Sequence, residues 1–376
     1  MKRSTDRIRT THTGSLIRPP ELLRLGEAAQ EDPTKEAAYQ NALRNEVAEV
    51  VRKQAAVGLD AISDGEFGKS SWAAYVLERV SGFTLDRDRR IPLLWLGSDR
   101  ERFADFFAED MPSSGGVPAE VCNGPITYTG QAAMDRDIAN FKAALATVSV
   151  DEAFLPVAAP ASTAYNGVNE YYKSDEEYAF AIADALRYEY RAIVDAGLLL
   201  QVDDAVLTHM HEQPGWERWA EIRIDALNHA LEGIPPDRVR YHICFGSWHV
   251  PHVADAPLSK LIKLVLKVNA GAYAIEAANA RHEHEWTLWE NTKLPEGKIL
   301  IPGVITHHTT VVEHPELVAQ RIVRLARLVG RENVIGGSDC GFAQSKGVQR
   351  VHPSIMWAKL EALVEGAKLA TAQLWK

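Results

Sequence analysis

The sequence predicts a single α/β domain built as a (β/α)8 barrel, the TIM barrel, with an insertion between its second and third strands. Two observations favour this fold: short apolar or β-branched runs alternate with longer amphipathic stretches, and about eight such units follow one another. Alternating strands and helices favour a parallel sheet, and this many units suit a closed barrel better than an open sheet. A chain of 376 residues with 46% hydrophobic residues is long enough for one such catalytic domain over residues 1–376.

Nine short runs are candidate strands, one more than a barrel needs. They cover residues 8–15, 60–68, 124–130, 153–160, 198–204, 238–246, 272–279, 298–305 and 333–342. The segment from about residue 80 to 150 is polar and rich in Asp and Arg, so we assign 124–130 to the insertion. Apolar residues at helical spacing predict helices over 36–58, 176–197, 314–330 and 357–375, and the first three end on a glycine.

The composition argues against several classes of protein. The formal net charge of −10 disfavours a nucleic-acid partner or an anionic membrane, since neutralising phosphates requires clustered Lys and Arg. No apolar run reaches the roughly 18 residues of a spanning helix, and no apolar segment of a secretory signal follows the basic N-terminus. The three cysteines favour free thiols in a reducing cytoplasm. We therefore expect a cytoplasmic protein that acts on small molecules, and a homo-oligomer is compatible with its sequence.

Polar residues gather where the predicted strands end. In a barrel, catalytic side chains lie at the carboxyl ends of the strands. A strand needs no carboxylate or thiol at its end for packing, so this clustering predicts an active site at the rim. The residues at these ends are His12, Gly14, Ser15, Asp64, Glu66, Asp203, Asp204, His242, Cys244, Glu276, His307, His308, Asp339 and Cys340.

A candidate metal site follows from four of these residues. His242 and Cys244 stand two residues apart, so both side chains point to the same side of a strand. Cys340 closes the last strand, and Glu276 closes the strand after the His-x-Cys strand. Two thiolates, one imidazole and one carboxylate suit Zn2+ better than Mg2+ or Ca2+, and Glu276 is the ligand we expect a substrate to displace. The alternative is a small buried Cys244 beside a hydrogen-bonded core histidine.

Zinc bound by two thiolates favours one kind of chemistry. Sulfur donors lower the Lewis acidity of the metal, so such a site suits water activation less well than a three-histidine site. It suits a substrate thiol held as thiolate at neutral pH, because a coordinated thiol is deprotonated. The chemistry we expect is therefore attack of a bound thiolate on a carbon electrophile.

Six motifs carry a resemblance to a known family. In chain order they are "TTHTGSLIRP", "SDGEFG", "LQVDD", "YHICFGS", "IEAAN" and "GSDCGF", spread over nearly the whole chain. The set resembles the catalytic barrel of cobalamin-independent methionine synthase, and more closely the single-barrel relatives that include epoxyalkane:coenzyme M transferase. The resemblance implies a zinc-bound thiol as the nucleophile.

The resemblance also implies roles for individual residues. It carries over His242, Cys244, Glu276 and Cys340 as zinc ligands. Glu66 and Asp203 correspond to the carboxylates that hold the amino group of homocysteine. Gly14 and Ser15 form the turn that receives the substrate carboxylate. A histidine after the "PGV" strand acts as the proton carrier, and its spacing favours His308 over His307.

Departures from the family leave the alkyl donor open. The chain lacks the N-terminal barrel of full-length methionine synthases, and no counterpart of the family's folate-stacking tryptophan is evident. His12 and Arg18, beside the Gly-Ser turn, are candidates for binding an anionic thiol, because Arg suits bidentate recognition of a sulfonate. Methyl transfer to homocysteine therefore competes with opening of an epoxide by a thiol such as coenzyme M.

Two other functions stay open. The "HMH" at 209–211 resembles the His-x-His of metal-dependent hydrolases, but it follows its strand rather than lying within it. Its position favours a loop that contributes to the mouth of the active site. A hydrolase predicts nitrogen- and oxygen-rich coordination in which Cys244 and Cys340 are dispensable. A non-catalytic barrel with a closed structural zinc site is the other alternative. The "RHEHEW" at 281–286 is interpreted as a charged, solvated loop, with a lining of the substrate pocket as its alternative.

Overall fold

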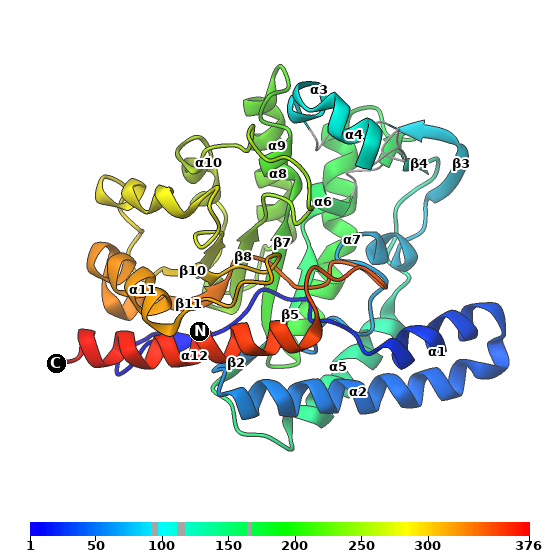
Figure 1. The fold of residues 1–376 in the computed structure, drawn as a ribbon. Helices are drawn as coiled ribbons and strands as arrows, with labels where there is room; N and C mark the ends of the chain where they lie inside the picture. The colour runs from blue at the N-terminus through cyan, green and yellow to red at the C-terminus, as the bar shows by residue number, and fades with distance from the viewer. Residues whose placement is uncertain (92–96, 111–116, 164–166) are drawn as a thin grey trace.

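The computed structural model describes residues 1–91, 97–110, 117–163 and 167–376 (Figure 1). An eight-stranded parallel sheet forms its centre, in the order β1-β11-β10-β9-β8-β7-β5-β2. Two hydrogen bonds close the gap between its ends: Asp60 N–H donates to Thr10 O over 3.0 Å, and the Thr11 hydroxyl donates to Ala61 O over 2.9 Å. The strands are β1 (Arg9–Thr10), β2 (Ala61–Ile62), β5 (Glu152–Ala158), β7 (Leu199–Asp204), β8 (Val239–Ile243), β9 (Ala272–Ile275), β10 (Ile299–Ile305) and β11 (Ile335–Ser338).

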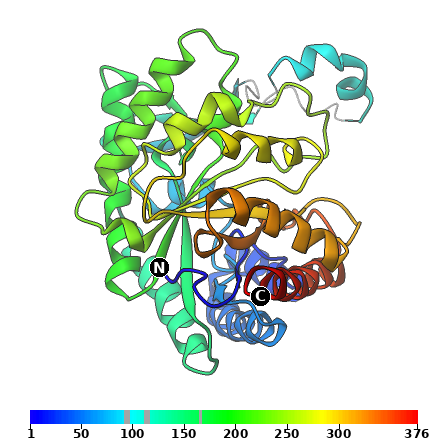
Figure 2. The ribbon, with the colours of Figure 1, turned by 90° about the vertical axis from the view of Figure 1, so that its left-hand side faces the viewer.

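Helices surround this sheet (Figure 2), which confirms the predicted barrel. The longer ones are α1 (Pro20–Glu31), α2 (Glu36–Val57), α5 (Gln131–Leu145), α7 (Asp175–Asp195), α9 (Trp216–Ala230), α10 (Leu258–Val265), α11 (Pro315–Val329) and α12 (Pro353–Leu374). The short ones are η1 (Pro33–Lys35), η2 (Ala74–Arg79), α6 (Pro160–Thr163), α8 (Val206–His209), η4 (Pro236–Arg238), η5 (Glu283–Glu290) and η6 (Arg331–Asn333).

Local signals in the sequence account for the limits of the predicted helices. Helix α2 ends at Gly58, whose φ of 96° lies in the left-handed region that glycine adopts without strain. Helix α7 begins after Ser174, whose hydroxyl accepts the N–H of Glu177. The sheet is covered on its outer face by the apolar sides of these helices, so strands such as β7 and β8 are buried along their whole length.

A second, three-stranded sheet lies between β2 and β7 in the sequence. It contains β3 (Phe83–Ile91), β4 (Val117–Cys122) and β6 (Gly167–Asn169), and the short helices α3 (Asp99–Arg102) and α4 (Ala104–Asp110) lie between β3 and β4 in the chain. β3 and β4 are antiparallel, whereas β6, from the loop after β5, pairs with β4 in parallel. Residues 124–130 are no barrel strand, as predicted; only Tyr128 makes an isolated bridge, to Val80.

The segment predicted as an insertion, about residues 80–150, contains helices as well as strands of the small sheet. Helix α5 lies within it and contacts the barrel helices α2 and α7. Residues 92–96 and 111–116 lie outside the described residues. Arg79, at the end of η2, connects the insertion to the barrel through ion pairs with Asp137 of α5 (2.6 Å) and Glu189 of α7 (2.5 Å), and all three side chains are buried. In the described part of the chain, no helix is both long and apolar enough to cross a bilayer.

Candidate active site

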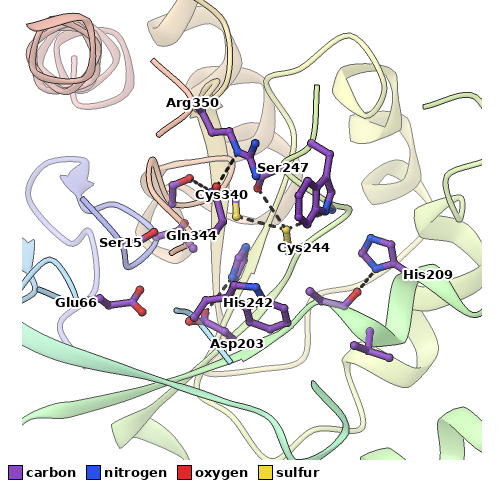
Figure 3. A pocket seen from close by; sticks show the side chains of 17 residues that line it. Ser15, Glu66, Asp203, His209, His242, Cys244, Ser247, Cys340, Gln344 and Arg350 are labelled. Atoms are coloured by element: carbon purple, nitrogen blue, oxygen red, sulfur yellow. Dashed lines mark hydrogen bonds and ion pairs between the residues drawn. The ribbon is translucent and has the colours of Figure 1, made fainter. Parts of the chain in front are cut away.

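A pocket with about 720 Å³ of empty space, including open solvent at its mouth, lies at the carboxyl ends of the barrel strands (Figure 3). Its walls come from the loops that follow β1, β2, β7, β8 and β11, so the site forms only when distant parts of the chain close into a barrel. The lining residues are Thr13, Ser15, Glu66, Trp72, Asp203, Ala205, Val206, His209, His242, Cys244, Gly246, Ser247, Trp248, Cys340, Gly341, Gln344 and Arg350.

The structure brings three of the four predicted zinc ligands together in this pocket. The sulfur atoms of Cys244 and Cys340 lie 3.3 Å apart, and both are free thiols. The His242 ring is buried beside them, with Nδ1 3.0 Å from Oδ1 of Asp203. The other ring nitrogen, Nε2, is buried and has no hydrogen-bond partner among the described residues. A carboxylate partner at Nδ1 fixes the proton there and leaves Nε2 as a free electron-pair donor.

Burial and close polar contacts shift the pKa values of His242 and Cys244. Burial lowers the pKa of His242, but the hydrogen bond and the charge of Asp203 outweigh this effect and the net shift is upward. Contact with the Cys340 thiol, together with burial, raises the pKa of Cys244 well above its usual range. The Cys244 thiol therefore stays protonated unless a cation binds it.

Glu276, the fourth predicted ligand, lies beside the group but does not line the pocket. Oε1 accepts the N–H of Phe245 over 3.0 Å, and Oε2 accepts hydrogen bonds from Asn279 over 2.7 Å and from Arg281 over 3.0 Å. Burial raises the pKa of Glu276 to about 8, although Arg281 acts in the opposite direction. Among the residues described, no three His, Cys, Asp or Glu side chains already stand at metal-binding positions.

The donor set nevertheless fits a zinc ion. A buried imidazole nitrogen without a partner is unfavourable unless something binds it. Two thiols in contact beside that nitrogen supply the sulfur ligands that zinc prefers. A carboxylate one strand away, held by side-chain and backbone donors, can serve as a fourth ligand.

Glu66 and Asp203 form an acidic side of the pocket. Glu66 has a φ of 61°, the only positive value at a non-glycine residue in the described part of the chain, a strained conformation of the kind found at functional sites. Burial raises the pKa of Glu66 to about 7, against the opposing charge of Lys69, whose Nζ lies 3.9 Å away. The charge of Asp203 contributes to the upward shift. Two carboxylates in one buried wall favour a cationic group between them.

The predicted Gly14–Ser15 turn reaches the same wall. Gly14 has a φ of 67°, and a Cβ atom placed on it would lie 2.5 Å from Oε1 of Glu66. Glycine is therefore required at this position for two reasons, conformation and space. Ser15 lines the pocket beside Gly341, whose own Cβ would lie 2.3 Å from the Ser15 hydroxyl.

The other predicted substrate-binding residues do not line the pocket. His12 is fully buried, with Nε2 2.7 Å from Oε1 of Gln54. Arg18 is also buried, and its guanidinium donates to the carbonyl oxygens of Glu66 over 2.6 Å, Lys69 over 3.1 Å and Ala343 over 3.3 Å. These contacts give Arg18 a role in holding the loops after β1, β2 and β11 together.

The two candidate proton carriers follow β10. His307 is fully buried, neither of its ring nitrogens has a partner among the described residues, and burial holds its pKa well below the usual value. Burial, with the nearby charge of Arg281, lowers the pKa of His308 to about 4. The two rings lie 4.8 Å apart, and neither belongs to the pocket lining. Both rings are therefore neutral at pH 7.

Several residues near the site were not identified from the sequence. Arg281 and His282, expected in a solvated loop, are instead mostly buried, because Arg281 pairs with Glu276 and with Asp255. The interpretation of 281–286 as solvated is wrong for these two residues. The sequence signal for this pairing is the position of Arg281, five residues after Glu276. His209, by contrast, lines the pocket, which agrees with the interpretation of "HMH" as part of a loop at the active-site mouth; its Nδ1 is bonded to the carbonyl oxygen of Ala205.

The fold and the pocket together define a class of protein: a (β/α)8 barrel with two thiols and an imidazole in one pocket at its carboxyl rim. Residues 8–98 and 119–367 match the family described as "Cobalamin-independent synthase, Catalytic domain". The chain belongs to this family, which confirms the resemblance of the six motifs.

Known relatives span nearly the whole chain. The methionine synthase of Thermococcus kodakarensis is 24% identical over 369 residues, which cover 97% of this chain and 94% of that protein. The methionine synthase of Sulfolobus acidocaldarius is 25% identical over 376 residues, covering 98% and 93%. Among solved structures, a B12-independent methionine synthase from Shewanella sp. W3-18-1, in complex with selenomethionine, has a TM-score of 0.70 at 19% identity, covering 98% of this chain and 99% of that one. This likeness confirms the fold.

Proposed function

We propose that this protein is a zinc-dependent methyltransferase that methylates the thiol of homocysteine to form methionine. The observation that carries the proposal is the unpartnered, buried Nε2 of His242, which lies beside two thiols in contact within the described part of the chain. Membership of the cobalamin-independent synthase family and relatives named methionine synthase support the same reaction.

His242, Cys244 and Cys340 are the proposed zinc ligands, with Glu276 as the ligand that a substrate displaces. Asp203 keeps the proton of His242 on Nδ1 and so presents Nε2 to the metal. When bound, zinc stabilises a substrate thiol in its thiolate form at neutral pH. When the Glu276 carboxylate is not bound to the metal, hydrogen bonds from Phe245, Asn279 and Arg281 stabilise it in its present position.

The acidic wall orients the amino acid. Glu66 and Asp203 accept the ammonium group of homocysteine, and the Gly14–Ser15 turn receives its carboxylate. His308, or its neighbour His307, is the proposed proton carrier. A neutral imidazole can accept the proton that the thiol releases and pass it to the leaving group.

Opening of an epoxide by an anionic thiol is the second candidate. The residues expected to bind the anionic thiol, His12 and Arg18, give this reaction little support, because neither lines the pocket and both hydrogen-bond to protein groups. The acidic pair that does line the pocket favours a thiol with an amino group. A metal-dependent hydrolase would leave the two thiols without a role.

Metal content and zinc K-edge absorption, measured before and after addition of homocysteine or coenzyme M, test the proposal. We expect bound zinc with two sulfur ligands, and three sulfur ligands after homocysteine alone. A third sulfur ligand with coenzyme M alone would favour the epoxide reaction. An unchanged spectrum with both thiols would overturn thiol activation and favour the hydrolase or a structural zinc.

A further inference from the structure

Arg350 is a cation in the pocket for which the proposed reaction has no role. It lies in the loop between β11 and α12, and its guanidinium stacks over the ring of Trp248 at 5.1 Å. Its Nε donates to Oε1 of Gln344 over 2.7 Å, and Gln344 in turn donates to the carbonyl oxygen of Gly341. The two terminal guanidinium nitrogens make no hydrogen bond with the part of the protein that the structure describes.

Two other arginines in this protein use their terminal nitrogens on protein groups. Arg79 lies between Asp137 and Glu189, and Arg18 donates to three carbonyl oxygens. Arg350 has no such set of acceptors among the described residues, although it is half-buried and lines the pocket. The described protein therefore leaves the two terminal nitrogens of Arg350 available to an anion in the pocket.

The surroundings of Arg350 point to a ligand rather than to a protein group. In Figure 3 the guanidinium lies on the far side of the cysteine pair from Glu66 and Asp203. Burial lowers the pKa of Arg350, and the groups that oppose this shift are the thiols of Cys340 and Cys244, not a carboxylate. The pocket therefore has an acidic side and a basic side, with the thiols between them.

We propose that Arg350, positioned by Gln344 and Trp248, is an anion-binding subsite that takes a carboxylate or sulfonate carried by one of the two substrates. The planar guanidinium offers its two free nitrogens to the two oxygens of such a group. The inference rests on the proposed function, since it takes this pocket to be where the thiol and the alkyl donor meet. It adds a recognition element that the acidic wall cannot supply.

Binding measurements with matched probes test the subsite and identify which substrate carries the anion. The thiol pair is coenzyme M and 2-mercaptoethanol, which differ in the sulfonate. The donor pair is 5-methyltetrahydrofolate and a 5-methyltetrahydropterin without the glutamate tail. Each is titrated by calorimetry into zinc-loaded and metal-stripped wild type, Arg350→Gln, Arg350→Lys and Lys346→Gln. Lys346 lies in the same loop outside the pocket lining, so its variant controls for charge and loop stability.

We expect Arg350→Gln to weaken the anionic member of one pair by about 10- to 100-fold and to leave its neutral member unchanged. Arg350→Lys should retain part of the affinity, and Lys346→Gln all of it. A loss confined to the thiol pair assigns the anion to the thiol, and a loss confined to the donor pair assigns it to the donor. Equal losses for anionic and neutral probes, no loss, or no binding of any anionic probe to wild type overturns the subsite. Failure of the proposed function would appear separately, as absence of zinc or of a zinc-dependent thiol affinity.

Discussion

Asp203 holds the ring of His242 by a 3.0 Å hydrogen bond to Nδ1, and the opposite nitrogen of that ring is buried in the pocket with no partner among the described residues. The pairing decides which nitrogen carries the proton. It therefore connects a carboxylate of the substrate-binding wall to the geometry of the proposed metal site.

Replacing Asp203 with asparagine should weaken zinc binding without removing a ligand. The amide no longer stabilises the Nδ1–H tautomer by charge, and loss of such a partner typically costs about 10- to 100-fold in metal affinity. Competition with a chromophoric chelator measures the change. Asp204→Asn is the control, because Asp204 accepts hydrogen bonds from Tyr241 and Ser162 instead. An unchanged zinc affinity in Asp203→Asn would contradict this role.

Replacing Cys340 with serine should abolish zinc binding and thiol alkylation together while the barrel stays folded. Cys340 lies at the rim beside Cys244, so its loss removes a donor and little packing. Elemental analysis measures the metal, and circular dichroism measures the fold. Cys122→Ser serves as the matched control, since Cys122 is buried in β4 of the smaller sheet. Full activity in Cys340→Ser would exclude the thiolate–zinc mechanism.

Glu66 should make homocysteine binding depend on pH. Its pKa of about 7 means that the carboxylate becomes protonated as the pH falls below 7 and can no longer neutralise an ammonium group. We expect the KM for homocysteine to rise on acidification in wild type. In Glu66→Gln it should be about 10- to 100-fold higher at pH 8 and nearly independent of pH. The control is 4-mercaptobutanoate, which is homocysteine without its amino group; an equal effect on its KM would exclude ammonium recognition.

The same substitution should stabilise the protein at alkaline pH. Burial raises the pKa of Glu66 from 4.5 to about 7 on folding. Between these values unfolding releases a proton, so the free energy of unfolding falls as the pH rises, and the full penalty remains above pH 7. Glu66→Gln removes this penalty. We therefore expect the variant to exceed wild type in free energy of unfolding by roughly 1–3 kcal/mol more at pH 8 than at pH 4. Urea unfolding at the two pH values measures it; a gain independent of pH would point to another cause.

Arg79 should be essential for stability. Arg79→Gln leaves the buried carboxylates of Asp137 and Glu189 without their cation, and breaking a buried ion pair in this way costs about 3–5 kcal/mol. Arg89→Gln provides the comparison, because Arg89 and Glu170 form an exposed pair, for which we expect a loss below about 1 kcal/mol. Urea unfolding at pH 7 distinguishes the two. Equal losses would show that the buried network contributes no more than a surface pair.

The parts of the fold and site that follow periodic rules were predictable from the sequence. Residues two apart on a strand share a face, and this spacing alone predicts that His242 and Cys244 lie together. Helices such as α7 and α11 appear within one or two residues of their predicted limits, because capping residues and apolar spacing mark them.

Contacts made by irregular loops were not predictable. The loop after β11 brings Arg350 back over the pocket, and no periodicity in residues 339–352 indicates that path. Arg281 was assigned to solvent on its charge alone, whereas Glu276 and Asp255 provide the buried partners that its charge requires. His12 and Arg18 show the converse: nearness in sequence to the Gly-Ser turn did not place them in the pocket.

The pairing of β6 with β4 affects how this barrel can be changed. The two strands come from the loops after two successive barrel strands, and they join in one small sheet. A graft that exchanged only the first loop for a relative's would leave β6 with an unpaired edge. A graft of the second loop alone would expose the edge of β4. The two loops are therefore a single exchangeable module. An exchange of either loop that aims to change the substrate range has to replace both loops together.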